Sequence, residues 1–85
     1  IAVLAVDEAT GALTLLTTVS TQGAAPRDFA LHTPSPTSPT FLLAANQDSD
    51  NIVGFVIAAA DGGVPRPIDG CVVPCNTPVS LCVVR

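Results

Sequence analysis

Apolar residues recur in short runs along the chain, and Gly, Pro, Asn, Asp and Ser stand between the runs. Short runs rich in Val, Ile, Leu and Phe that are bounded by such turn residues are typical of β-strands. The pattern predicts six strands, over residues 1–6, 12–20, 27–32, 41–47, 51–57 and 64–73. The clearest part is residues 26–57, where three strands follow one another with a turn between each pair. We therefore expect an all-β fold.

The chain also contains an internal repeat with a period of about 50 residues. The aligned pairs are Ile1 with Ile52, Val6 with Ile57 and Gly11 with Gly62 and, after one inserted residue, Pro26 with Pro78, Phe29 with Leu81 and Leu31 with Val83. A period near 50 with about four strands per unit indicates the blades of a β-propeller. A β-sandwich is the alternative, but its turn signals come without a longer period. The repeat predicts antiparallel four-stranded blades, about one and a half to two of them.

The repeat divides the chain into three parts. Residues 1–25 are expected to be the outer strands of a preceding blade, residues 26–73 one four-stranded blade, and residues 74–85 a C-terminal closing strand. Hairpin connections alternate between the two ends of a blade, so the loop before residue 27 and the loop at 48–50 should lie at one end. Arg27, Asp28, Asn46 and Gln47 are then expected to converge near one mouth of the central channel.

Composition limits the class of protein and the kinds of partner that the chain can have. The chain is 48% hydrophobic and 12% charged, which is typical of a folded chain rather than a disordered one. Its net charge of -4 and lack of a basic patch argue against a nucleic-acid partner. No signal peptide or membrane-spanning run is visible, so no membrane partner is expected. Because the sequence opens inside an apolar run without Met, we expect a fragment of a longer chain; a processed mature protein is the alternative.

Three cysteines, Cys71, Cys75 and Cys82, make an odd number without C-x-x-C spacing. Free, partly buried thiols in a reducing cytosol fit this pattern best, so we expect a cytoplasmic protein. A bridge between Cys71 and Cys75 would require export.

The stretch A-P-R-D-F-A-L at 25–31, followed by F-L-L-A-A-N-Q-D-S-D-N-I-V-G-F-V-I at 41–57, resembles the C-terminal part of the lactonase family of seven-bladed β-propellers. That family includes bacterial 6-phosphogluconolactonase and the fungal carboxymuconate-lactonising enzyme. Residues 1–13 are similar to its strand–turn–strand pattern, and residues 78–83 to its usual ending. Two segments depart from the family: the proline-rich loop 32–40, and the outer strand with Pro65 and Pro67, which suit only an edge strand.

The resemblance implies hydrolysis of a sugar lactone, which requires an activated water and donors for the developing oxyanion. Arg27 is then expected to bind a phosphate or second carboxylate on the substrate, and a salt bridge to Asp28 or to a neighbouring blade is the alternative. Asn46 and Gln47 would donate hydrogen bonds into the channel, or else cap a strand end and order the next turn. The predicted substrate-binding residues are thus Arg27, Asp28, Asn46 and Gln47, with the general base upstream.

No cofactor or metal is expected. Residues 48–51 lack the glycine and distal Glu of a calcium loop, which favours a solvated turn. His32 is expected at the opposite end of the blade, and no second histidine is present to build a zinc site. The spacing of Pro34, Pro36 and Pro39 fits a proline-motif ligand, although a flexible insertion is simpler.

Two hypotheses about function follow. In the first, the chain is part of a lactone hydrolase, and its partner is a small sugar lactone. In the second, it is a non-catalytic propeller piece whose open strand edges join a partner or a second copy. The 85 residues alone are not expected to catalyse a reaction, because a channel site draws on several blades.

Overall fold

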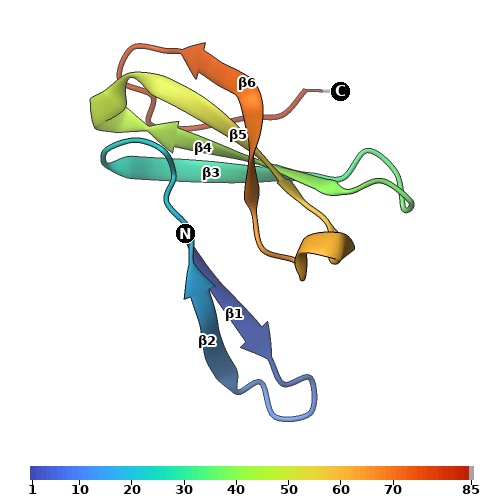
Figure 1. Ribbon diagram of the computed structural model, residues 1–85. Helices are drawn as coiled ribbons and strands as arrows, with labels where there is room; N and C mark the ends of the chain where they lie inside the picture. Colours follow the sequence, from blue (N-terminus) through green and yellow to red (C-terminus); the bar gives the residue numbers. More distant parts are fainter. Residues whose placement is uncertain (85) are drawn as a thin grey trace.

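The computed structural model describes residues 1–84, which form two antiparallel sheets and contain no α-helix (Figure 1). The strands are β1 (Ala2–Val6), β2 (Leu13–Thr18), β3 (Pro26–His32), β4 (Thr40–Asn46), β5 (Asn51–Ile57) and β6 (Arg66–Pro74). Two single 3-10 turns, η1 (Gln47–Ser49) and η2 (Ala59–Asp61), join β4 to β5 and β5 to β6. The first sheet is the β1–β2 hairpin, and the second has the order β3-β4-β5-β6. The predicted all-β, four-stranded antiparallel architecture is confirmed.

The two central strands pair in one unbroken register. Thr40 lies opposite Ile57 at one end of the β4–β5 ladder, and Asn46 lies opposite Asn51 at the other. Side chains alternate between the two faces along a strand, so Ala45 of β4 and Phe55 of β5 point to opposite faces of the sheet. Both residues are fully buried. The face of Phe55 is the better covered one, because Leu43 and Ile52, on the face of Ala45, are only half-buried.

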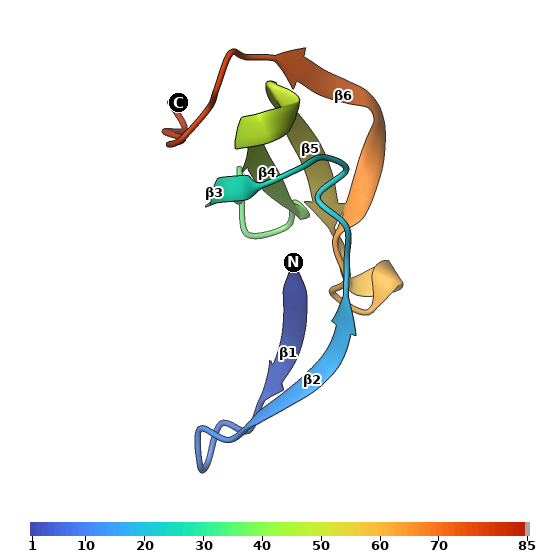
Figure 2. The ribbon, with the colours of Figure 1, turned by 90° about the vertical axis from the view of Figure 1, so that its left-hand side faces the viewer.

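One face of this sheet packs against the start and end of the hairpin. Leu42, Ala44, Val53 and Phe55 form a buried cluster, and Ile1 and Val19 pack against it. Figure 2 shows the hairpin as a separate, curved arm that meets the four-stranded sheet only at this end. The hairpin therefore contacts this face of the sheet only through the residues at its two ends.

The backbone confirms the internal repeat. Gly11 and Gly62, which the sequence aligns, both have a positive φ, of 75° and 67°. Ala25 and Thr77, which precede the aligned prolines, also share a positive φ, of 53° and 47°. Left-handed backbone is uncommon at residues other than glycine, so its return at aligned positions is a specific match.

Most predicted strand boundaries differ from the structure by one or two residues; the strand expected over residues 12–20, for example, spans Leu13–Thr18. Gln47, predicted to end a strand, begins η1 instead, because its N–H donates to Ala25 O at 3.0 Å rather than to a strand partner. The outer strand begins at Arg66 instead of residue 64, since Val64 N–H is held by Asp61 O in the preceding turn. Pro67 lies on β6, the edge strand that tolerates it.

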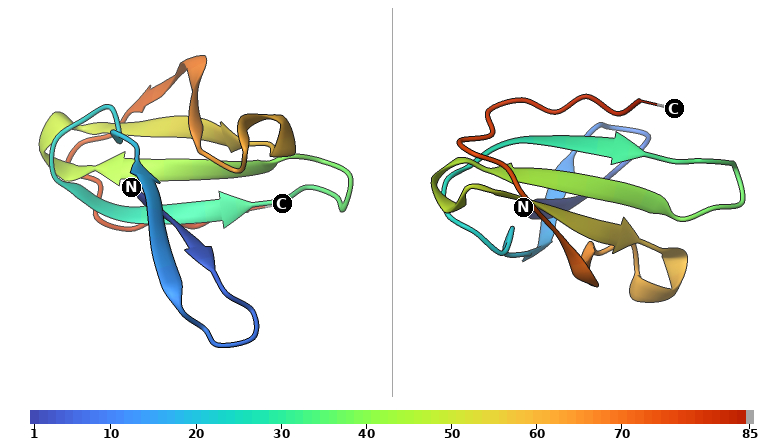
Figure 3. Two further views of the ribbon diagram at one scale, coloured as in Figure 1. Left: turned by 60° about the horizontal axis from the view of Figure 1, so that its bottom comes forward. Right: turned by 90° about the horizontal axis from the view of Figure 1, so that it is seen from above.

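The closing strand expected over residues 74–85 is not formed in this structure. Pro74 ends β6, and residues 75–84 have no regular ladder but run beside β3 (Figure 3). Leu81 N–H is bound by the Asp28 carboxylate at 2.8 Å, so a side chain replaces the carbonyl that a ladder would use. Residue 85 lies outside the described residues.

The three cysteines are free, as predicted. Cys71 and Cys75 are half-buried, whereas Cys82 is exposed rather than partly buried. No helix in residues 1–84 has the length and apolar character needed to cross a membrane.

Candidate functional site

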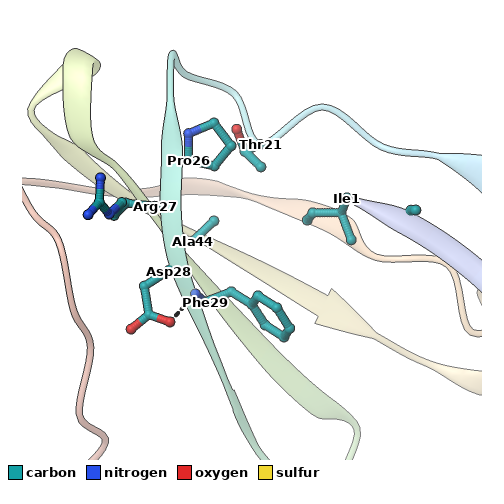
Figure 4. A pocket seen from close by; sticks show the side chains of 8 residues that line it. Ile1, Thr21, Pro26, Arg27, Asp28, Phe29 and Ala44 are labelled. Atoms are coloured by element: carbon teal, nitrogen blue, oxygen red, sulfur yellow. Dashed lines mark hydrogen bonds between the residues drawn. The ribbon is translucent and has the colours of Figure 1, made fainter.

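β3 begins with a bulge that determines where Arg27 points. Pro26 lies opposite Asn46 and Asp28 lies opposite Ala45, so Arg27 is the extra residue between two paired positions. A bulge of this kind bends a strand and redirects a side chain. Figure 4 shows Arg27 and Asp28 on one side of β3, with Pro26 and Phe29 on the other. Without the extra residue, neighbouring side chains such as Arg27 and Asp28 would alternate between the two faces.

Both carboxylate oxygens of Asp28 accept backbone hydrogen bonds. Oδ1 accepts from Phe29 N–H at 2.9 Å, and Oδ2 accepts from Leu81 N–H at 2.8 Å. The sequence repeat aligns Phe29 with Leu81. Asp28 therefore links two positions that the repeat aligns, one inside β3 and the other in the C-terminal segment.

Arg27 is exposed and forms no ion pair within the described residues. The ion pair that residues 1–84 do contain joins Arg66 and Asp61 at 3.3 Å, at the far end of the blade. The salt bridge between Arg27 and Asp28, which was the alternative to substrate binding, is therefore not formed. The guanidinium is left without a neutralising partner beside a carboxylate that is already bound by two N–H groups.

Asn46 is fully buried and joins the blade to the loop that precedes β3. Its Nδ2 donates to Thr21 O at 2.9 Å and to Asn51 Oδ1 at 3.0 Å, while its Oδ1 has no partner. Gly23 lies so close that a Cβ there would be 2.5 Å from Asn46 Nδ2. These contacts favour the ordering role considered for Asn46, and substrate binding by it stays a prediction.

Gln47 and the rest of η1 contact the same loop through main-chain N–H groups and through the Ser49 hydroxyl. Asp48 N–H donates to Ala24 O at 3.2 Å, and Ala24 N–H donates to Ser49 Oγ at 2.6 Å. The expected turn at residues 48–51 is confirmed, and so is the expectation that the two loops share one end of the blade. His32, opposite Phe41, lies at the other end of β3, as predicted.

A hollow of about 300 Å³ separates the hairpin from β3. It is lined by Ile1, Ala2, Thr21, Pro26, Arg27, Asp28, Phe29 and Ala44. The Arg27 side chain points away from Ile1 and Phe29, so the guanidinium is not inside the apolar part of the hollow (Figure 4). An anion bound by Arg27 would lie on the other side of β3, the side on which Asp28 also points.

The arrangement can bind an anionic group but holds no evident nucleophile. Arg27 offers free N–H donors, while both oxygens of its neighbour Asp28 are already hydrogen-bonded. Sequence reasoning identified these two residues but missed Thr21, Gly23 and Ser49, which hold the loop. Their only signal was a run of small residues before Pro26, and such runs are common in loops of every kind.

The model of a protein family described as lactonase, 7-bladed beta-propeller, matches residues 1–84. No curated protein matches the chain significantly. No solved structure does so either.

Proposed function

The chain belongs to the lactonase family of seven-bladed β-propellers, and from this premise we propose that it is part of a sugar-lactone hydrolase in which Arg27 binds the anionic group of the substrate. Residues 1–84 build one four-stranded sheet and one hairpin, which is fewer than seven blades. The remaining blades would come from further chain, and the proposed activity is that of the assembled propeller.

The exposed, unpaired guanidinium of Arg27 is the observation that supports this proposal. A guanidinium group is commonly neutralised by the nearest carboxylate. Here that carboxylate, Asp28, instead accepts hydrogen bonds from the N–H groups of Phe29 and Leu81. The planar fork of arginine matches phosphate and carboxylate groups in a bidentate geometry. The bulge in β3 adds to the argument, because bulges are over-represented next to active sites.

In the proposed reaction, a water oxygen attacks the lactone carbonyl carbon, the ring C–O bond breaks, and a hydroxy acid is released. A general base takes a proton from the water and returns it to the leaving ring oxygen, which becomes the hydroxyl group of the product, while donors stabilise the oxyanion. Arg27 positions the substrate through its remote anionic group and takes no proton. We assign the general base to the other blades, since Asp28 is engaged by two N–H donors.

The finer part of the proposal is a substrate of the 6-phosphogluconolactone type in a cytoplasmic protein. A terminal phosphate would provide the dianion that an unpaired arginine binds well. Gln47, which lies at the same end of the blade, is proposed as a further hydrogen-bond donor to the substrate. Asn46 would act indirectly, by holding the loop that precedes Arg27.

Titration of the assembled propeller that contains this chain with 6-phosphogluconate, the stable product of such a reaction, tests the role of Arg27. Arg27→Gln should weaken binding about tenfold or more, because a charge-assisted contact is worth roughly 1.5–3 kcal/mol. Arg66→Gln removes the same charge at the other end of the blade and should change the dissociation constant less than about twofold. Gluconate, which lacks the phosphate, should bind the unmodified chain weakly. Equal binding by the two variants would contradict the proposal.

A second function, that of an interaction module, is favoured by a different observation. β1 is paired with β2 on one edge and, among the described residues, with nothing on the other. An unpaired strand edge is a template for adding another strand.

A further inference from the structure

The loop between β3 and β4 concentrates hydroxyl groups and prolines. Five of the eight residues 33–40 are Ser or Thr, the other three are Pro, and none carries a charge. A proline directly follows three of the hydroxyl residues, Thr33, Ser35 and Ser38. This loop is one of the two segments that depart from the lactonase pattern, so membership of the family does not account for it.

The loop projects from the end of the blade. His32 opposite Phe41 is the last pair of the β3–β4 ladder. Thr40 opposite Ile57 is the last pair of the β4–β5 ladder. Figure 1 shows the loop extending past the ends of these strands. Blades stand side by side around a channel, so neighbouring blades cover the faces of a blade and not its ends. The loop therefore lies where an enzyme in solution can reach it.

Few hydrogen bonds hold the tip of the loop, residues 34–39. Within residues 1–84, the tip forms one main-chain hydrogen bond, from Ser38 N–H to Ser35 O at 3.1 Å. Ser35 Oγ lies 2.8 Å from Ser38 Oγ and 3.2 Å from Thr37 Oγ1. No residue of the tip belongs to a strand, so opening this turn leaves the β3–β4 ladder intact. The tip can thus adopt the extended conformation in which a protein kinase binds its substrate.

We propose that Ser35 is phosphorylated by a proline-directed protein kinase. Pro36, the residue after it, has no N–H group and a fixed φ, and kinases of this class select their substrates by that residue. Ser35 also has free loop on both sides, since residues 33–34 precede it and residues 36–39 follow it outside the strands. The proposal goes beyond the hydrolase function and does not depend on it, because Ser35 and Arg27 lie at opposite ends of β3.

The two other hydroxyl groups that precede a proline are less accessible to a kinase. Thr33 directly follows β3, so the residues before it are held in the β3–β4 ladder, and its hydroxyl oxygen lies 2.7 Å from that of Thr40. Ser38 is separated from β4 by Pro39 alone, so the residues after it are held in the β4–β5 ladder. Binding of either residue in an extended segment would unpair strand residues, and binding of Ser35 avoids this.

In the reaction, Ser35 Oγ attacks the γ-phosphorus of ATP, and the bond from that phosphorus to the bridging oxygen of ADP breaks. A carboxylate of the kinase takes the hydroxyl proton, so the products are phosphoserine, ADP and a proton. Phosphoserine carries a charge of about −1.5 to −2 at pH 7. The hydroxyl groups of Thr37 and Ser38, which already lie beside Ser35 Oγ, become donors to the phosphate oxygens. An uncharged loop thus becomes an anionic one that an arginine-bearing partner can bind.

A proline-motif ligand is the other interpretation of the same prolines. Such a ligand presents its proline rings from an extended polyproline II segment and makes no use of neighbouring hydroxyl groups. In this loop the hydroxyl residues outnumber the prolines, and three of them stand directly before one. This arrangement favours the kinase.

Phosphorylation of the propeller that contains this chain is the direct test, with a cyclin-dependent protein kinase and Mg²⁺-ATP as the probe. Peptide mapping by mass spectrometry should find the phosphoryl group on Ser35. Pro36→Ala should lower kcat/KM for phosphorylation about tenfold or more. Pro39→Ala makes the same change further along the loop and should alter kcat/KM less than about threefold. No incorporation of phosphate, or equal values for the two variants, overturns the proposal.

Further measurements identify the acceptor and the modification. Ser35→Ala should abolish incorporation while far-UV circular dichroism stays unchanged, and a phosphoryl group on Thr33 or Ser38 of the unmodified protein overturns the assignment. Protein isolated from its source should carry a phosphoryl group on Ser35, whereas a hexose on the hydroxyl groups of the loop would overturn the proposal. Arg27→Gln should be phosphorylated at the normal rate, which separates this proposal from the lactone site.

Discussion

Gly54 lies in β5 directly beneath the side chain of Cys71, and an alanine at this position would collide with it. A Cβ on Gly54 would lie 2.3 Å from Cys71 Sγ and 3.3 Å from Cys71 Cβ. Favourable contacts between such atoms occur at about 3.5–4.0 Å, so the sulfur would overlap the new methyl group by more than 1 Å. Gly54 is buried, and Cys71 is half-buried at the bulge of β6 that faces it.

The expected cost follows from two opposing effects. Overpacking of a core costs about 1–3 kcal/mol. Alanine recovers roughly 0.5–1 kcal/mol because it reduces the entropy of the unfolded chain, and Gly54 has no positive φ that would forbid it. We therefore expect Gly54→Ala to lower the free energy of unfolding by about 1–2 kcal/mol, measured by urea denaturation with far-UV circular dichroism.

A double-mutant cycle isolates the collision. In a Cys71→Ala background the sulfur is absent, and the contacts that remain are those to the Cβ at 3.3 Å and to the carbonyl oxygen at 3.7 Å, so Gly54→Ala should cost close to nothing or stabilise slightly. The coupling energy should be about 1–2 kcal/mol. Gly11→Ala is the control, because Gly11 has open space around it and its cost comes from its φ of 75° alone. That cost should be the same in both backgrounds. An equal cost of Gly54→Ala with and without the Cys71 sulfur would refute the steric argument.

Further substitutions test the contacts around the candidate site. Gly23→Ala should lower the free energy of unfolding by about 1–3 kcal/mol, because its Cβ would meet the buried Asn46 side chain at 2.5 Å; an unchanged urea midpoint would contradict this. Asp28→Ala should free the N–H of Leu81, so hydrogen exchange at that amide should accelerate roughly tenfold or more, while exchange in the distant β2 stays unchanged. Gly11→Ala should cost about 1–2 kcal/mol in the free energy of unfolding, and Gly11→Asn should cost less, because asparagine tolerates the left-handed region better than alanine.

The elements and their order could be predicted from the sequence because they depend on local patterns. Short apolar runs between turn residues fixed the strands, and the period of the repeat fixed the blade and the end at which Arg27 lies. The positive φ of Gly11 and Gly62 could be expected from the sequence, because a φ near 70° is more favourable for glycine than for any other residue.

The details of the site depend on contacts between distant segments, which the sequence does not display. The bulge at Arg27 appears only when β3 is aligned with β4. The bond from Leu81 to Asp28 joins residues that lie 53 positions apart in the chain, so a carboxylate predicted to face a substrate is found binding main-chain N–H groups. Burial of Asn46 likewise follows from how the loop containing Thr21 and Gly23 folds over the strand end.

The left-handed residues Ala25 and Thr77 have a consequence for how such repeats diverge. Both precede a proline, Pro26 at the start of β3 and Pro78 in the C-terminal segment. Different atoms hold them, however: Ala25 O accepts from Gln47 N–H, whereas Thr77 N–H donates to Asp50 Oδ1. After duplication, a blade can thus keep its backbone path while it exchanges the contacts that hold that path. Protein engineers can use the same freedom, because glycine at either position would relieve backbone strain without moving the strand that follows.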